Sequence, residues 1–197
     1  MIRSPHDLDL AGRCASGDRA AQRQLFRDQK RRVHATLYRI LGSNRDMEDL
    51  VQDAFLEIFR SLDRFRGEAK LATWVDRITA RVAYHYLSRK RSGHVHLEAV
   101  PEIETGDPSA ERRAIARDAA RRIYEVLDRL DPKYRIAFAL HVIDGRPLRE
   151  VADITEASLV ATKSRVWRAR REIFKRAKRD PALAAYLAAS ERGEVGT

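Results

Sequence analysis

Apolar residues recur at helical spacing along almost the whole chain, and this periodicity is the strongest constraint on the fold. The clearest case is the segment 47–62, where apolar residues follow the i, i+3, i+4, i+7 pattern and polar residues fill the opposite face. No stretch of strict apolar and polar alternation, bounded by turn residues, is long enough to predict a sheet. We therefore expect an all-α fold.

Capping signals divide the first half of the chain into three long helices. Ser16-Gly17-Asp18 predicts the start of the first helix, and Gly42 predicts its end. The segment 47–62 is the second helix. After a break at Arg66-Gly67 comes the third, which we expect to end near residues 91–93.

The segment 92–107 loses helical periodicity and has the composition of a linker. It contains Gly93, Pro101 and Gly106, and the stretch 98–111 holds five acids and no base. Such a segment cannot bury enough apolar surface to offset its own ordering entropy. We therefore expect a flexible acidic linker between two domains that fold separately and sample more than one arrangement in the free protein.

The second half of the chain has the layout of a helix-turn-helix. Asp107-Pro108 and Asp131-Pro132 each combine an N-cap with a proline at the first helical position, so each predicts a helix start. A short helix through 151–154 then leads, by a tight turn, to Ser158, which caps a long basic helix. The tail 180–197 has apolar residues at helical spacing, which favours a short packed helix over a partner contact.

Positive charge is concentrated in two zones. The chain has 39 Lys and Arg against 29 Asp and Glu, a formal net charge of +10, which favours a polyanionic partner. Nine basic residues accompany one acid in the segment 161–179, and five accompany no acid in 77–91. Acids gather instead on the helix 47–62, where they could form a solvated or partner-binding face.

Several classes of protein are excluded by what the sequence lacks. The lone Cys14 excludes an intramolecular disulfide and an all-cysteine zinc site. His94 and His96 have no further ligand at metal spacing, and the acids of 47–62 have no second carboxylate cluster to complete a two-metal site. No phosphate-binding loop, nucleophile elbow or Cys/His dyad is present, so we expect no cofactor. Without a long apolar run or a secretory signal, we expect no membrane insertion and a cytoplasmic location.

The long basic helix offers a face that could enter the major groove of DNA. Arginine can bind guanine or phosphate through two hydrogen bonds, and small residues let the backbone approach the groove. The alternative is a solvated basic face at the end of the chain. The candidate DNA contacts on this helix are Ser158, Lys163, Ser164, Arg165, Arg168 and Arg171.

The third long helix and the loop before it alternate aromatic and basic residues. Unstacked bases need rings on which to stack and cations to neutralise their phosphates. Trp74 also lies on the apolar stripe of this helix, which favours a place in the core. The candidate contacts with single-stranded DNA are Arg66, Lys70, Trp74, Arg77, Arg81, Tyr84, His85, Arg89, Lys90 and Arg91.

The order of these parts resembles the extracytoplasmic-function (ECF) sigma factors, a class of the bacterial sigma-70 family. The segments 46–59, 63–69 and 73–78 are similar to the family's region 2, and 162–173, after the helix around 150–152, is similar to its region 4. The resemblance covers residues 18–91 and 112–177. It implies a division into region 2 (1–91), linker (92–111), region 4 (112–179) and a C-terminal tail (180–197).

This resemblance implies a promoter-specificity subunit and not an enzyme. Asp49, Gln52, Asp53 and Phe55 would dock on the clamp helices of the largest subunit of core RNA polymerase. The basic and aromatic set would capture single-stranded bases of the minus-ten element. The region 4 helix would read the double-stranded minus-35 element beside the polymerase flap. The family also implies an anti-sigma partner.

Two positions depart from the family pattern. Family members often carry Asn where this chain has Arg81, so the base preference at the minus-ten element is not carried over. The turn of the helix-turn-helix commonly has Gly where this chain has Glu156. Because glycine adopts positive φ most cheaply, we expect a different turn angle here.

Two other classes of function remain as alternatives. A stand-alone regulator that uses only the helix-turn-helix would explain residues 132–178 but leaves 46–91 without a task. A nucleic-acid-modifying enzyme would need a metal site or a nucleophile, and the sequence shows neither.

Overall fold

The computed structural model describes residues 4–92 and 108–191, and all regular structure in these ranges is helical. The all-α prediction is confirmed. The first group comprises α1 (Pro5–Ala15), α2 (Arg19–Leu41), α3 (Met47–Ser61), a short 3-10 helix η1 (Leu62–Arg64) and α4 (Leu71–Ser92). The second comprises α5 (Pro108–Leu127), α6 (Pro132–Phe138), a π-helix η2 (Ala139–Ile143), α7 (Leu148–Ile154), α8 (Leu159–Ala177) and α9 (Pro181–Glu191).

The ends of α2 form as the sequence predicts. The carboxylate of Asp18 accepts hydrogen bonds from the backbone N–H groups of Ala20 and Ala21, which caps the start of the helix. Gly42 ends it with φ +71°, and its N–H donates to the carbonyl of Tyr38 at 2.7 Å. The helix is therefore fixed at both ends by residues that local pattern identifies.

Helix α1 was not among the predicted elements. Ser4 caps it and Pro5 occupies its first position, a signal that the sequence does contain. Its residues Leu10 and Cys14 are buried in the core of the first group. The carboxylate of Asp7 accepts the backbone N–H of Leu71 at 2.9 Å, so α1 also fixes the start of α4.

The second group confirms the helix-turn-helix and the packed tail. Helices α7 and α8 flank a tight turn, and the hydroxyl of Ser158 caps α8. The helix predicted to start at Pro132 begins as α6 and widens into the π-helix η2. Helix α9 packs beside α5 and α8, with Leu183 fully buried.

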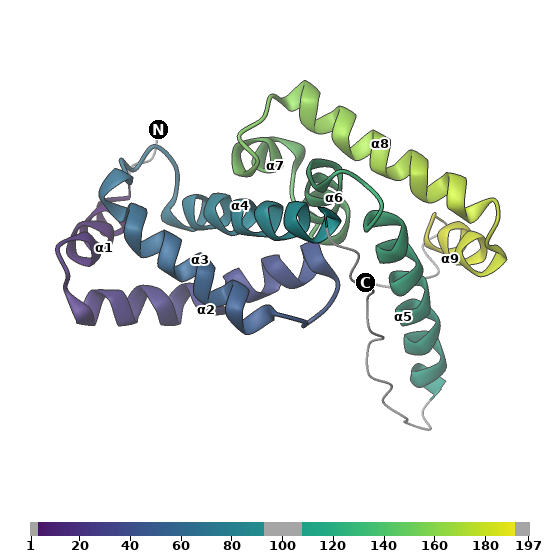
Figure 1. Ribbon diagram of the computed structural model, residues 1–197, viewed down its shortest axis with the longest axis horizontal. Helices are drawn as coiled ribbons and strands as arrows, with labels where there is room; N and C mark the ends of the chain where they lie inside the picture. The colour runs from purple at the N-terminus through teal and green to yellow at the C-terminus, as the bar shows by residue number, and fades with distance from the viewer. Residues whose placement is uncertain (1–3, 93–107, 192–197) are drawn as a thin grey trace.

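The two groups pack directly against one another, as Figure 1 shows for α4 beside α6 and α7. One continuous apolar cluster contains Leu37 and Ile78 of the first group and Ile136, Leu140 and Ile154 of the second. The shared cluster gives the two groups one packed arrangement, whereas the sequence predicts domains that sample more than one arrangement. The linker itself was expected at 92–111. Residues 93–107 lie outside the described residues, 108–111 belong to α5, and the predicted domain boundaries remain predictions.

The C-terminus of α2 is capped by the second group. Arg135, which is only 3% exposed, donates to the carbonyls of Ile40 and Leu41 at 2.7 and 2.6 Å. The hydroxyl of Tyr124 donates to the carbonyl of Arg39 at 2.5 Å. These bonds satisfy carbonyl groups that a helix end leaves without an intrahelical partner. The interface is therefore specific as well as apolar.

Candidate nucleic-acid and protein interfaces

The acidic face of α3 is exposed where the sequence predicts it. Asp49, Gln52 and Asp53 lie in solvent, opposite the buried stripe of the helix. Phe55, the fourth predicted contact, is only 4% exposed, and its ring centroid lies 4.6 Å from that of Phe26. The neighbouring Leu56 is 44% exposed instead. Phe55 therefore supports this surface from below and does not project from it.

A groove of about 700 Å³ runs between α2 and α3 beside these acids. Its walls are mainly apolar, and polar residues of both signs stand along its edges. A groove of this composition suits the apolar face of an amphipathic helix. The residues that line it are Phe26, Lys30, His34, Asn44, Met47, Glu48, Val51, Gln52, Phe55, Leu56 and Phe59.

The predicted single-stranded DNA contacts differ in exposure. Trp74 is partly buried, with its ring edge against Phe65 at a centroid separation of 5.6 Å, which agrees with the core role that its apolar stripe favours. Tyr84 is also partly buried. The ammonium of Lys90 lies over the ring of Tyr86 at 5.9 Å. The exposed members of the set are Arg66, Lys70, Arg81, His85 and Arg89, while Arg77 is partly exposed and Arg91 lies in the last turn of α4.

Helix α8 presents its basic residues mostly to solvent. Ser158 uses its hydroxyl to accept the N–H of Ala161, so its first role is to cap the helix. Arg168 donates to the hydroxyl of Tyr134 at 2.6 Å, and the guanidinium of Arg171 lies 5.4 Å from the ring of Trp167. The exposed members of the predicted set are Ser158, Lys163, Ser164, Arg168 and Arg171, and Arg165 is half-buried.

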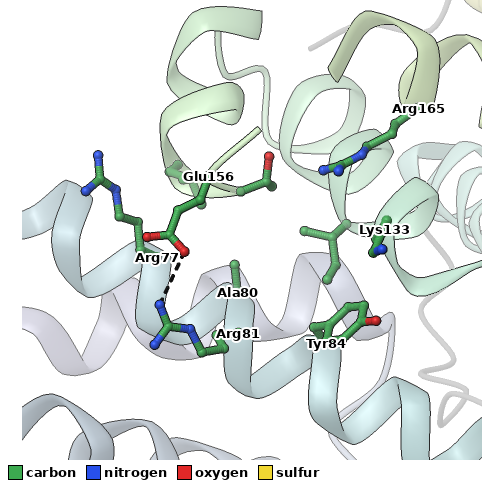
Figure 2. A pocket seen from close by; sticks show the side chains of 10 residues that line it. Arg77, Ala80, Arg81, Tyr84, Lys133, Glu156 and Arg165 are labelled. Carbon is green, nitrogen blue, oxygen red and sulfur yellow. Dashed lines mark hydrogen bonds and ion pairs between the residues drawn. The ribbon is translucent and has the colours of Figure 1, made fainter. Parts of the chain in front are cut away.

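A cleft of about 190 Å³ brings the two predicted DNA-binding sets together (Figure 2). Arg77, Arg81 and Tyr84 of α4 lie on one side, and Arg165 of α8 lies on the other. The turn before α8 closes the cleft with Glu156. These residues are far apart in sequence, so only the packing of the two groups creates the cleft.

Three residues near these surfaces escaped prediction. Lys133 adds a cation to the cleft, and Glu156 adds its acid. Trp167 is 58% exposed on α8, and its position on the solvent face is visible in the helical periodicity. The roles of the other two depend on packing between distant segments, for which the sequence carries no local signal.

The described residues bring together no group of His, Cys, Asp and Glu that could hold a metal ion. His94 and His96 lie outside the described residues. Cys14 is buried, and this burial raises the pKa of its thiol. Among the described helices, none combines the length and apolar character needed to cross a membrane.

Together, these features are those of a two-domain helical protein with separate basic and acidic surfaces. The chain matches two protein-family models, sigma-70 region 2 over residues 25–93 and sigma-70 region 4 over residues 120–173. The ECF RNA polymerase sigma factor SigE of Mycolicibacterium smegmatis is 30% identical over 166 residues, 81% of this chain and 63% of the relative. The ECF RNA polymerase sigma-E factor of Escherichia coli K12 is 28% identical over 176 residues, 85% of this chain and 92% of the relative.

A solved structure of CnrH in complex with the cytosolic domain of CnrY has the same fold. The TM-score is 0.58 at 24% sequence identity, over 93% of this chain and 97% of that chain. The chain belongs to the sigma-70 family of RNA polymerase sigma factors, in its extracytoplasmic-function class. This membership accounts for both halves of the sequence, including the acidic and aromatic segment that a stand-alone regulator leaves without a task.

Proposed function

We propose that this protein binds core RNA polymerase and directs promoter-specific initiation of transcription, while catalysis belongs to the core enzyme. The observation that carries this proposal is the pair of matched regions in the family's order, each with the exposed charge that its partner requires. Region 2 presents acids for a protein partner and cations for DNA. Region 4 presents the basic helix α8, which is the second helix of a helix-turn-helix.

The acidic face of α3 is proposed as the contact with the polymerase clamp helices. Asp49, Gln52 and Asp53 are exposed and free to meet a basic partner, and the apolar groove beside them extends the surface. Phe55 contributes by supporting Phe26 at the groove. Charge complementarity of this kind acts mainly on the rate and orientation of encounter.

The two basic surfaces are proposed to bind promoter DNA in different forms. The arginines and Tyr84 of α4, with Arg66 and Lys70 of the preceding loop, would hold the single-stranded minus-ten element. Helix α8 would enter the major groove of the minus-35 duplex, with region 4 near the polymerase flap. Arginines suit both tasks because the guanidinium binds phosphates and guanine.

An anti-sigma protein is proposed as a further partner. The family resemblance implies one, and the fold neighbour CnrH was solved with the cytosolic domain of CnrY bound. Co-purification of a partner that inhibits transcription in vitro would test this part of the proposal.

The decisive experiment is run-off transcription with purified core polymerase on the promoter upstream of the protein's own gene. We expect a transcript of defined start only when the chain is added to core enzyme. A chain that binds promoter duplex but neither co-purifies with core enzyme nor produces a transcript would contradict the proposal and favour a stand-alone regulator.

A further inference from the structure

Two arginines of the proposed minus-ten surface are already bonded within the chain. Arg77 donates its Nε–H to the carbonyl of Asp153 at 2.9 Å, and Arg81 lies 3.3 Å from the carboxylate of Glu156. Both acceptors lie at the end of α7 and in the turn that follows, and Figure 2 shows Glu156 extending toward α4. A DNA phosphate would compete for the same guanidinium groups, because carboxylate and phosphate bind arginine in similar ways.

Glu156 reaches this position through an uncommon backbone conformation. Its φ is +48°, in the left-handed region that residues other than glycine rarely adopt. Glycine is the residue that adopts such a conformation at least cost. A glycine at this turn would leave Arg81 without its anionic partner, so the side chain of Glu156 adds a contact that the turn itself does not require.

A charge network across the same interface holds the turn in place. Arg146, between η2 and α7, donates to Asp76 of α4 at 2.5 Å and to the hydroxyl of Thr36 of α2 at 3.2 Å. Asp144 pairs with Arg39 of α2 at 2.9 Å. The side chain of Asp76 is fully buried and that of Arg146 is 11% exposed. Burial alone would lower the pKa of Arg146, but hydrogen bonds from its guanidinium to Asp76 and Asp144 raise it above the ordinary value.

The two buried charges of this network each have a second partner within their own domain. Asp76 accepts from Arg32 of α2 at 2.7 Å. Arg146 donates to Asp144 at 2.5 Å and to Glu150 at 3.2 Å. Separation of the domains therefore leaves neither charge unpaired, which avoids the main cost of breaking a buried ion pair. Opening would still expose the apolar cluster that both domains share, so apolar contacts also stabilise the closed arrangement.

We propose that this closed arrangement is a self-inhibited state, in which Glu156 competes with DNA for Arg81 and the Arg146 network keeps the turn against α4. The inference rests on the proposed function only in naming minus-ten DNA as the displaced ligand. An exposed ion pair such as Arg81–Glu156 contributes little free energy alone. The buried contacts of Arg146 and Asp76, together with the apolar cluster that both domains share, stabilise the closed arrangement, and Glu156 provides the competing charge.

The first test measures binding of the free full-length chain to a fluorescent single-stranded oligonucleotide of mixed sequence by anisotropy. Glu156→Gln removes the competing charge with little change in shape, and we expect affinity to rise about two- to fivefold. Asp153→Asn is the matched control, because it removes the same charge from an exposed side chain nearby and keeps the carbonyl that binds Arg77. An equal gain from both variants would show a general charge effect and overturn the proposal.

The second test opens the interface with Arg146→Ala. We expect a larger radius of gyration in small-angle scattering, unchanged helicity and tighter oligonucleotide binding than for Arg149→Ala, which removes an equal charge from an exposed side chain nearby. Arg39→Ala is a second opening variant, should Arg146→Ala fail to fold. If either folded variant opens but binds the oligonucleotide no better than the Arg149→Ala control, or if neither opens, the proposal is wrong.

These measurements separate the inference from the proposed function. Scattering and oligonucleotide binding need no polymerase, so a chain that fails in run-off transcription can still show self-inhibition. A chain that directs transcription, but whose Glu156→Gln and Arg146→Ala variants behave like their controls, would overturn self-inhibition alone.

Discussion

Two arginines of α8 are held by aromatic residues of their own domain. The guanidinium of Arg168 lies 5.4 Å from the ring centre of Tyr134 and donates to its hydroxyl, and that of Arg171 lies over Trp167. An aromatic face orients a guanidinium while leaving most of its N–H groups free to donate. We therefore expect both side chains to meet DNA with little further loss of side-chain entropy.

Replacement of Arg165 and Arg168 by alanine tests these side chains individually and together. Loss of a base-reading arginine should cost about 1–3 kcal/mol of binding free energy and relax the preference at one base pair. Loss of a phosphate contact should weaken binding to all sequences alike and flatten its salt dependence. Titration of minus-35 duplexes at several salt concentrations distinguishes the two. Lys178→Ala, at the far end of α8, is the control. If the double variant binds like wild type, α8 is not the reader.

For single residues, the sequence predicts which side chains face solvent better than it predicts which distant side chains they contact. The periodicity of α3 places Asp49 and Asp53 in solvent, because a helix that buries one stripe must expose the other. It cannot predict that Arg81 meets Glu156, 75 residues further along the chain. It also misses that Phe55 lies beneath Phe26, because that depends on how α2 crosses α3.

Helix α3 buries one face in the core and exposes the acidic face that we propose as the contact with polymerase. Asp49→Lys with Asp53→Lys should abolish binding to core polymerase and leave helicity and thermal unfolding nearly intact, because both side chains lie in solvent. Pull-down of core enzyme, with circular dichroism, measures both effects. Asp28→Lys with Asp63→Lys makes the same charge change on other exposed surfaces and should retain binding. A double variant that unfolds, yet binds core normally per folded molecule, would assign the acids a structural role.

Helix α9 is attached through Asp180, whose carboxylate accepts from Arg122 at 2.8 Å and from the N–H of Leu183 at 3.2 Å. The hydrogen bond from Arg122, and then that from Leu183, lower the pKa of Asp180. A carboxyl with a lower pKa in the folded state stabilises the fold fully above its ordinary value of 3.8. This contribution is lost as the pH falls through the lower folded value.

Variants of Asp180 should reproduce this acid effect at neutral pH. Asp180→Asn keeps an acceptor for Leu183 but loses the charge that meets Arg122, so we expect a lower melting temperature and a weaker acid dependence. Asp180→Ala also removes the cap and should melt lower still. Melting curves between acid and neutral pH measure both. Equal melting of wild type and Asp180→Ala at neutral pH would show that α9 is held by apolar contacts alone.

Regular elements were mostly predictable, and the exceptions have physical reasons. The ends of α2 and the start of α8 were predicted because capping is local chemistry, visible in Asp18, Gly42 and Ser158. The π-helix η2 was not, because it differs from an α-helix only in which carbonyl accepts each N–H.

At the scale of the whole molecule, the contacts between the two domains are the feature least visible in the sequence. The polar segment between two amphipathic patterns predicts two domains that fold separately. The structure joins them through contacts such as Arg135 with Ile40 and Tyr124 with Arg39, across 95 and 85 residues. Such pairs leave no periodic signal, since each arginine or tyrosine could equally face water.

The packing of Tyr124 on Gly42, at the interface between the domains, can be tested by replacing Gly42 with alanine. Alanine there should cost about 1–2 kcal/mol for its positive φ, and further because the new Cβ would lie 2.4 Å from Cδ1 of Tyr124. Denaturant unfolding measures the total. Adding Tyr124→Ala should remove only the steric part of the cost of Gly42→Ala. The loss of unfolding free energy in the double variant should therefore be smaller than the sum of the two single losses. Strict additivity would show that the ring of Tyr124 does not pack on Gly42 in solution.

The π-helix gives the chain an unusual sensitivity to changes in length. In η2 the N–H of Asp144 donates to the carbonyl of Ala139, five residues back, so this turn contains one residue more than an α-helical turn. Val142 and Ile143 are both partly exposed, and we expect substitutions there to be tolerated. Deletion of either should instead restore an ordinary helix and shift Asp144 and Arg146 by one position. Homologous chains that lack this residue should therefore join their domains in a different way.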